Sequence, residues 1–269
     1  MKKILYFSIV TILFLSACKK EDTTPASEYD VNKMGYISIK FDNQVGNLNL
    51  VLDSPFYTNP LNQNYTISKF NYFVSNIVFI NEDGTERAIP QDSSYFLIEE
   101  TNPDSKVLEL RVPEGNYKSV KFMIGVDSLK STRPVNERTG VLDPSGAAAG
   151  MYWTWNSGYI FMKMEGTYDA PNDTVIGNQT YMYHIGGFGP TINNIKTTEV
   201  SFNTSRATVR QSKGTDGPEV HIYVDASKVI SGNTNVDFTL NPTVMFAPYS
   251  TTIANNYVNM FSLAHLHDE

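Results

Sequence analysis

The stretch VLELRVPEGNYKSVKFMIGV, at positions 107–126, decides the fold class. Apolar and polar residues alternate over positions 107–112, as they do in a strand that buries one face. Proline, glycine and asparagine follow within 113–117, and these residue types favour a turn. β-Branched and aromatic residues return at 119–126. The stretch therefore predicts a strand, a turn and a second strand.

The same patterns recur along most of the chain. GYISIKF at 35–41 alternates strictly, and residues 65–80 predict either one long strand with a bend or a helical turn that leads into a strand. Glu82-Asp83-Gly84 predicts a hairpin turn. Strands that follow one another without regular intervening helices predict an all-β antiparallel β-sandwich, immunoglobulin-like or related. The further predicted strands lie at 95–98, 153–165, 180–185, 199–202, 207–209, 219–225 and 236–240.

Three segments lack the strand pattern. Residues 127–150 hold prolines, glycines and three successive alanines, and they predict a long loop with a short helix. Long loops in compact domains are often functional. Residues 226–230 and 251–261 predict short helical turns, the second of which ends near His265.

The first residues predict an exported lipoprotein. The apolar run at 4–14 is too short for a membrane-spanning helix, and Leu-Ser-Ala-Cys at 15–18 resembles a lipoprotein cleavage site. We expect residues 1–17 to be a signal peptide. We expect Cys18 to carry acyl chains that anchor the protein to a membrane.

A polar tether is predicted after the anchor. Residues 18–34 hold few apolar side chains, whereas 35–269 are numerous enough to form a single β domain. The tether resembles those of Bacteroidota lipoproteins, which implies the outer membrane, with either the periplasmic or the surface face. Because Cys18 is the only cysteine, an intrachain disulfide is excluded.

Charge and motifs exclude several functions. The formal net charge of −7 becomes −9 when Lys2 and Lys3 leave with the signal peptide. An acidic domain without a basic cluster argues against nucleic acid as a partner. The chain has no HExxH, P-loop, dinucleotide-binding or Gly-x-Ser-x-Gly pattern. We therefore expect a binding protein and not an enzyme.

The four histidines offer candidate metal ligands. In an extended strand, His265 and His267 would leave one face with their Cα atoms about 7 Å apart. Imidazole suits zinc, copper, iron and nickel. The alternative is that these two side chains belong to a polar, frayed chain end. His184 fits either a ligand or a core histidine, and His221, in an alternating strand, fits a surface or cross-strand position.

Both tryptophans lie in MYWTWNSGYIFMKMEG, at 151–166. If this segment is one strand, Trp153 and Trp155 share a face, which is either core or an aromatic binding site. Met162 and Met164 also share a face; thioethers can bind soft metals, but methionine in a strand mostly fills the core.

Three carboxylates lie in or near the long loop. Asp127, Asp143 and Glu165 could supply oxygen ligands to a calcium ion, although the chain has no EF-hand spacing. The alternative is that they are solvated or cap helix ends.

Six segments together resemble the MbnP-like family of exported bacterial copper-binding proteins. The block at 151–166 is the most specific of them, and the resemblance covers the chain from about residue 35 onward. The fold that it implies is a β-rich sandwich. The six segments are FNYFVSNI at 70–77, VPEGNY at 112–117, FMIGVD at 122–127, the block at 151–166, YHIGG at 183–187 and NMFSLAHLH at 259–267.

The resemblance also implies a function. Characterised members bind copper through histidines together with a tryptophan that a di-haem enzyme of the cytochrome c peroxidase type has oxidised to kynurenine. Carried over to this chain, the candidate histidines are His184, His265 and His267, and the candidate tryptophan is Trp153 or Trp155. We thus expect a copper-binding lipoprotein that serves acquisition or storage.

Two other functions fit the sequence. The chain has sixteen tyrosines and fifteen phenylalanines beside its two tryptophans, so an aromatic platform could bind glycans or another ligand at the cell surface. A module that docks on an outer-membrane partner would instead need an exposed apolar patch.

Overall fold

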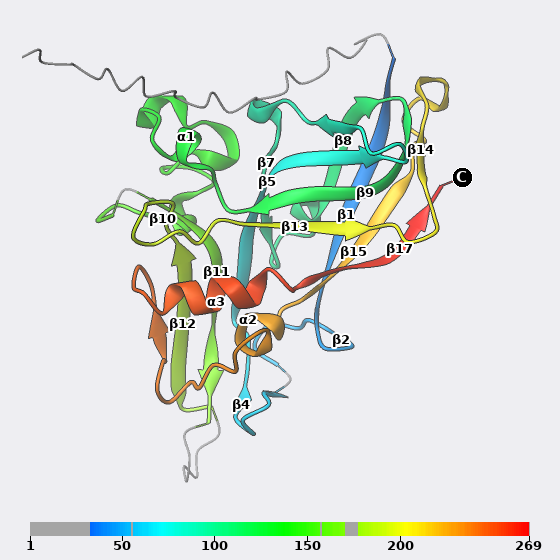
Figure 1. Ribbon diagram of the computed structural model, residues 1–269. Helices are drawn as coiled ribbons and strands as arrows, with labels where there is room; N and C mark the ends of the chain where they lie inside the picture. Colours follow the sequence, from blue (N-terminus) through cyan, green and yellow to red (C-terminus); the bar gives the residue numbers. More distant parts are fainter. Residues whose placement is uncertain (1–32, 55, 157, 170–176, 269) are drawn as a thin grey trace, which may run out of the picture.

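The computed structural model describes residues 33–54, 56–156, 158–169 and 177–268. The predicted signal peptide, Cys18 and nearly all of the tether lie outside these residues. The described chain is all-β, as predicted, with a few short helices and 3-10 turns (Figure 1). None of its helices has the length and apolar character needed to cross a membrane.

The strands in chain order are β1 (Met34–Val45), β2 (Leu48–Asn49), β3 (Tyr57–Thr58), β4 (Asn64–Tyr65), β5 (Lys69–Asn81), β6 (Glu86–Ala88), β7 (Tyr95–Glu99), β8 (Val107–Pro113), β9 (Gly115–Ile124), β10 (Tyr152–Trp153), β11 (Gly158–Tyr168), β12 (Gln179–Gly186), β13 (Lys196–Ser201), β14 (Ala207–Val209), β15 (Glu219–Asp225), β16 (Thr243–Val244) and β17 (Phe261–His267). The helices are α1 (Ser128–Ser131), α2 (Lys228–Ser231) and α3 (Ser250–Tyr257).

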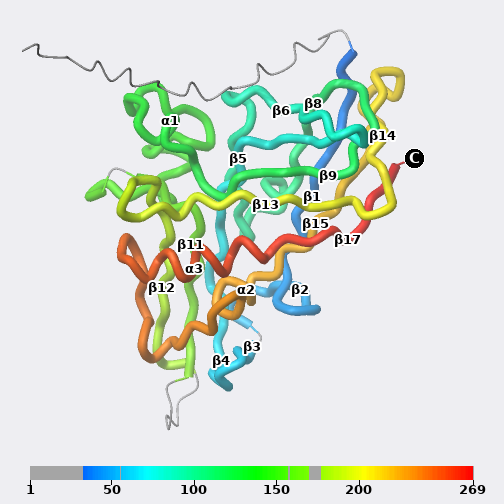
Figure 2. The backbone as a smooth tube through the Cα atoms, in the orientation of Figure 1, coloured from blue at the N-terminus to red at the C-terminus, as the bar shows by residue number. Residues whose placement is uncertain are grey.

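Two sheets form the body of the domain. Over the described residues, the smaller sheet has the order β17-β15-β1-β2, with β8 also on β1, and the larger one is built on the path β13-β9-β5-β11-β12-β16. Pairing is antiparallel apart from β1 with β15 and β12 with β16. The smooth trace in Figure 2 shows β13 of one sheet running beside β17 of the other.

The bend in the opening stretch carries the chain from one sheet to the other. β8 pairs with β1 in the smaller sheet, whereas β9 pairs with β5 and β13 in the larger one. The two predicted strands are confirmed, but the turn predicted at 113–117 is only a bend at Glu114 between β8 and β9, and the two strands do not pair with each other. This connection ties the sheets together at one edge.

The sheets share one hydrophobic core. Strict alternation in β1 buries Ile37, Ile39 and Phe41, as the sequence predicted. The ring of Phe41 meets that of Phe122 from β9 edge-on, at 5.8 Å between centroids, and both rings contact Phe261 at the start of β17. Edge-to-face aromatic pairs add to the stabilisation that comes from burial alone. The first residue of β17 is therefore fixed between the two sheets.

The structure decides the ambiguous segment at 65–80 and tests two further predictions. Residues 69–81 form the single strand β5, and its bend is a bulge between Ser75 and Val78, where Asn76 adopts a positive φ of 51°. The predicted hairpin at Asp83 and Gly84 joins β5 to β6. The predicted strand at 236–240 is wrong, because Asp237 caps a turn there by accepting hydrogen bonds from Thr239.

The long loop and the two helical turns follow the prediction. Residues 127–151 hold α1 and three short 3-10 turns. This loop covers a second, smaller core, in which the hydroxyl of Tyr159 donates to the carbonyl oxygen of Leu142 at 2.6 Å. The helices α2 and α3 overlap the predicted segments at 226–230 and 251–261, and α3 is followed closely by β17.

Candidate metal site

A β-bulge turns the histidines of β17 to the outside. His221 pairs with His265, and the next residue of β15, Ile222, pairs with Leu263, so Ala264 is an extra residue. Leu263 and Leu266 pack against the core, whereas His265 and His267 are exposed. Without an extra residue, positions 263 and 265 would lie on the same face. The bulge thus lets one strand contribute leucines to the core and histidines to the surface.

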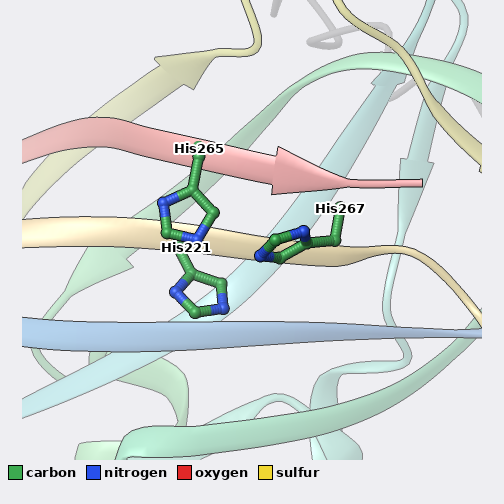
Figure 3. A group of neighbouring side chains, drawn as sticks. All are labelled: His221, His265 and His267. Carbon is green, nitrogen blue, oxygen red and sulfur yellow. The ribbon is translucent and has the colours of Figure 1, made fainter. Parts of the chain in front are cut away.

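The two strands bring three imidazoles together on the outer face of the smaller sheet (Figure 3). His221 faces outward from β15, directly beside His265. Ring centroids lie 4.1 Å apart for His221 and His265, 4.7 Å for His265 and His267, and 5.4 Å for His221 and His267. Among the described residues, this is the one group of three potential ligands whose donor atoms all lie within 4.8 Å of one another.

These separations suit one ion after a small adjustment. Metal–nitrogen bonds of about 2.0–2.1 Å place two imidazole nitrogens about 3.3–3.6 Å apart around a shared ion. The nitrogens of the group must therefore approach by at most about 1.5 Å. His265 and His267 are exposed, so side-chain rotation alone can supply this movement.

The electrostatic surroundings of His265 favour ligand binding at this residue. Partial desolvation, followed by the neighbouring His221 and His267, lowers the pKa of His265, which favours the neutral imidazole that a metal requires. Glu219 lies in register with His267, and its Oε1 accepts a hydrogen bond from Nε2 of His221. That hydrogen bond holds the pKa of the Glu219 carboxyl below its ordinary value.

His184 lies in a different part of the molecule. It belongs to β12 in the larger sheet, where its Nε2 donates to Oε1 of Glu165 at 2.6 Å. Burial lowers the pKa of His184, although the hydrogen bond to Glu165 acts in the opposite direction. The structure therefore does not bring His184 to the two terminal histidines, and His221 lies beside them instead.

The tryptophans also lie away from the histidine group. β10 and β11 form a hairpin in which Trp153 pairs with Gly158, so the segment is two strands and not one. Trp153 is 5% exposed and Trp155, in the turn, is 64% exposed, which corrects the expectation that they share a strand face. Their ring centroids still lie 5.5 Å apart. β10 and β17 lie on opposite sides of the molecule in Figure 1.

The methionines and carboxylates singled out in the sequence have structural partners. Met162 and Met164 are fully buried in the core. Asp127 caps α1 and accepts a hydrogen bond from Tyr95 at 2.5 Å. Asp143 accepts one from the backbone of a turn at 2.8 Å. Glu165 accepts a hydrogen bond from His184. Each of the three carboxylates proposed for calcium thus has its own protein partner.

Sequence reasoning missed His221 as a member of the group. Its outward position could be read from the alternation of VHIYV at 220–224. Its proximity to His265 could not be read from the sequence. The pairing of β15 with β17 brings together residues that lie 44 positions apart, and no local pattern specifies that pairing.

Comparison with known proteins shows which family this chain belongs to and which solved structure has a similar fold. A family model described as MbnP matches residues 34–246. The chain belongs to the MbnP family. The solved structure of MbnP from Methylosinus trichosporium is similar, with a TM-score of 0.52 and 14% sequence identity over 86% of this chain and 98% of that chain. At this identity the likeness shows the fold alone. No curated protein matches the sequence.

The MbnP segment and the histidine group overlap only in part. The matched residues include His221, His184 and both tryptophans, but they end before α3 and β17. Two of the three grouped histidines, His265 and His267, therefore lie outside the segment that defines membership of the MbnP family.

Proposed function

We propose that this member of the MbnP family is a copper-binding protein that holds the ion at His221, His265 and His267 and carries out no catalytic turnover. The observation that carries the proposal is the convergence of three imidazoles from two paired strands, with donor atoms within 4.8 Å. Imidazole suits several transition metals, and copper binds most tightly in the divalent series. The resemblance described above also points to copper.

The proposed site differs from the one that the resemblance implies. A tryptophan oxidised to kynurenine at position 153 or 155 would lie far from the histidine group, so it is not a ligand in this proposal. Trp155 is 64% exposed, so a di-haem partner enzyme would reach it more easily than the buried Trp153. We propose that such oxidation, where it occurs, concerns Trp155 and a separate function.

The proposed setting is the outer membrane. Acylation of Cys18 would anchor the chain, and the 16 residues from 18 to 33 can span at most roughly 50–60 Å before β1 begins. The histidine group would thus work within a short distance of the bilayer, on its periplasmic or its surface side.

A copper titration with matched histidine variants tests the proposal. We expect the purified protein to bind one equivalent of copper in competition with a chelator, and we expect the double variant His265→Ala, His267→Ala and the single variant His221→Ala to lose that binding. His184→Ala is the matched control, because His184 is partnered by Glu165 in the other sheet. Copper binding that survives in the double variant, or that disappears in His184→Ala, would refute the site.

The aromatic surface supports a second candidate function, the binding of a glycan or another ligand. Trp155 and Phe246 are 64% and 38% exposed, and both rings contact Trp153. The planes of the two indoles are inclined by 44°, so they do not form a flat platform. A change in tryptophan fluorescence on addition of oligosaccharides, lost in Trp155→Ala, would favour this function; an unchanged spectrum would reject it.

A further inference from the structure

Glu219 completes a square of four outward side chains on two strands. It precedes His221 by two residues on β15, and the residues opposite these two are His267 and His265. Directly opposed residues in an antiparallel pair have Cβ atoms about 4.5–5.5 Å apart. The carboxylate of Glu219 already reaches the group, since its Oε1 accepts the hydrogen bond from Nε2 of His221.

The donors available to an ion here are nitrogen and oxygen. Neither β15 nor β17 contains methionine or cysteine, and Met162, Met164 and Met260 are buried in the core. Sulfur ligands favour Cu⁺, whereas imidazole and carboxylate suit divalent ions. A carboxylate also attracts an ion of charge +2 twice as strongly as an ion of charge +1 at the same distance.

We propose that the ion takes the place of the proton between Nε2 of His221 and Oε1 of Glu219, so that Glu219 is the fourth donor and the site selects divalent copper over Cu⁺. This inference rests on the proposed function and adds to it the oxidation state of the bound copper ion. The imidazole of His221 keeps one proton, which moves through water to Nδ1, and the Nε2 lone pair binds the ion. The hydrogen bond lost between the two side chains is replaced by two metal bonds.

The surroundings allow this exchange. The side chain of Glu219 is 39% exposed, so it can turn without disturbing the core. Lys40 of β1 lies in register with His221 on the side away from His265. Its positive charge lowers the affinity for any cation, and the negative charge of Glu219 offsets it.

Separate titrations with Cu²⁺ and Cu⁺ test the role of Glu219. We expect Glu219→Gln to weaken Cu²⁺ binding about tenfold or more. Cu⁺ affinity, measured under reducing conditions against a chromophoric chelator, should fall by a smaller factor, about threefold for a tenfold loss of Cu²⁺ affinity, because the carboxylate attracts Cu⁺ half as strongly. The electron paramagnetic resonance spectrum of the Cu²⁺ protein should shift as an oxygen donor is lost. Glu109→Gln is the matched control. Glu109 and Glu219 line one cavity of about 180 Å³, but Glu109 belongs to β8 and is not among the residues that pair with β17.

The outcomes separate this inference from the proposed function. Equal weakening of both ions by Glu219→Gln would show that Glu219 only orients His221, and unchanged Cu²⁺ affinity would show that it has no role; either result overturns the inference and leaves the histidine site intact. If the triple variant His221→Ala, His265→Ala, His267→Ala still bound both ions with unchanged affinity, the proposed function itself would be overturned. Unchanged thermal unfolding of metal-free Glu219→Gln would confirm that the fold is preserved.

Discussion

A pair of one-residue changes at the β17 bulge tests how the histidine group is built. Ala264 is the extra residue between the pairs Ile222–Leu263 and His221–His265. Insertion of one alanine after Ala264 lets the ladder continue regularly, with Ala264 opposite His221. His265 then moves two positions along β15, to lie opposite Glu219, which is a shift of about 7 Å. That distance far exceeds the adjustment of at most about 1.5 Å that the group can make by side-chain rotation.

The insertion should therefore remove two of the three ligands from His221. Loss of joint binding by linked groups lowers affinity by roughly 10²–10⁴-fold, and we expect a decrease of that size in a chelator competition titration. Leu266 still faces the core but moves two positions along β15, and the inserted alanine takes its place opposite Val220. The free energy of unfolding in urea should therefore fall by roughly 1–3 kcal/mol, and the affinity is measured where the variant is fully folded.

Deletion of Ala264 is the matched control. It removes the extra residue but leaves His265 opposite His221 and keeps Leu263 and Leu266 inside. Copper affinity should stay within about threefold of the unaltered protein, because no ligand changes its place in the register. Retained affinity in the insertion variant, or its loss in the deletion variant, would refute the reasoning that the register of β17 against β15 places the histidines beside His221.

Three further predictions concern other parts of the molecule. Burial lowers the pKa of His184 below 6.5, so on acidification the unfolded chain takes up a proton before the folded chain does, and stability falls below about pH 6.5. His184→Gln should reduce that fall in urea unfolding measured from about pH 7.5 to about pH 5, and an unchanged fall would contradict the assignment. Trp155→Phe should remove most of the indole fluorescence that iodide quenches, since Trp155 is 64% exposed and Trp153 only 5%; quenching that persists would contradict these positions. Gly166→Ala should lower the free energy of unfolding by roughly 1–3 kcal/mol, because its Cβ would meet a carbonyl oxygen at 2.0 Å. Gly150→Ala, which meets no atom within 4 Å, should change the free energy by less than about 0.5 kcal/mol, and equal effects would refute the clash.

Local patterns predicted the strands well because each pattern has a local cause. The alternation at 35–41 became β1 with every second residue buried, and the turn residues at 82–84 became a hairpin. Pairing between distant strands has no such signal. The sequence at 113–117 predicts a turn, whereas the chain makes only a bend at Glu114 and passes from one sheet to the other there.

The candidate site was predictable only in part for the same reason. His265 and His267 are two residues apart in an extended strand, so their proximity followed from strand geometry. His221 joins them through pairing of β15 with β17, which only the folded chain determines. Trp153 and Trp155 were misplaced because a turn interrupts what reads as one apolar strand, and the pattern alone does not show where a hairpin folds back.

The bulge at Ala264 also bears on self-association. β17 is the outermost strand of the smaller sheet, and an edge strand with a regular row of unpaired backbone groups is a template for pairing with another molecule. An extra residue breaks that regular row, and bulges are one of the devices by which natural sheets avoid aggregation at their edges. The irregularity that turns two histidines toward solvent therefore also makes this edge a poor partner for a second copy of the chain.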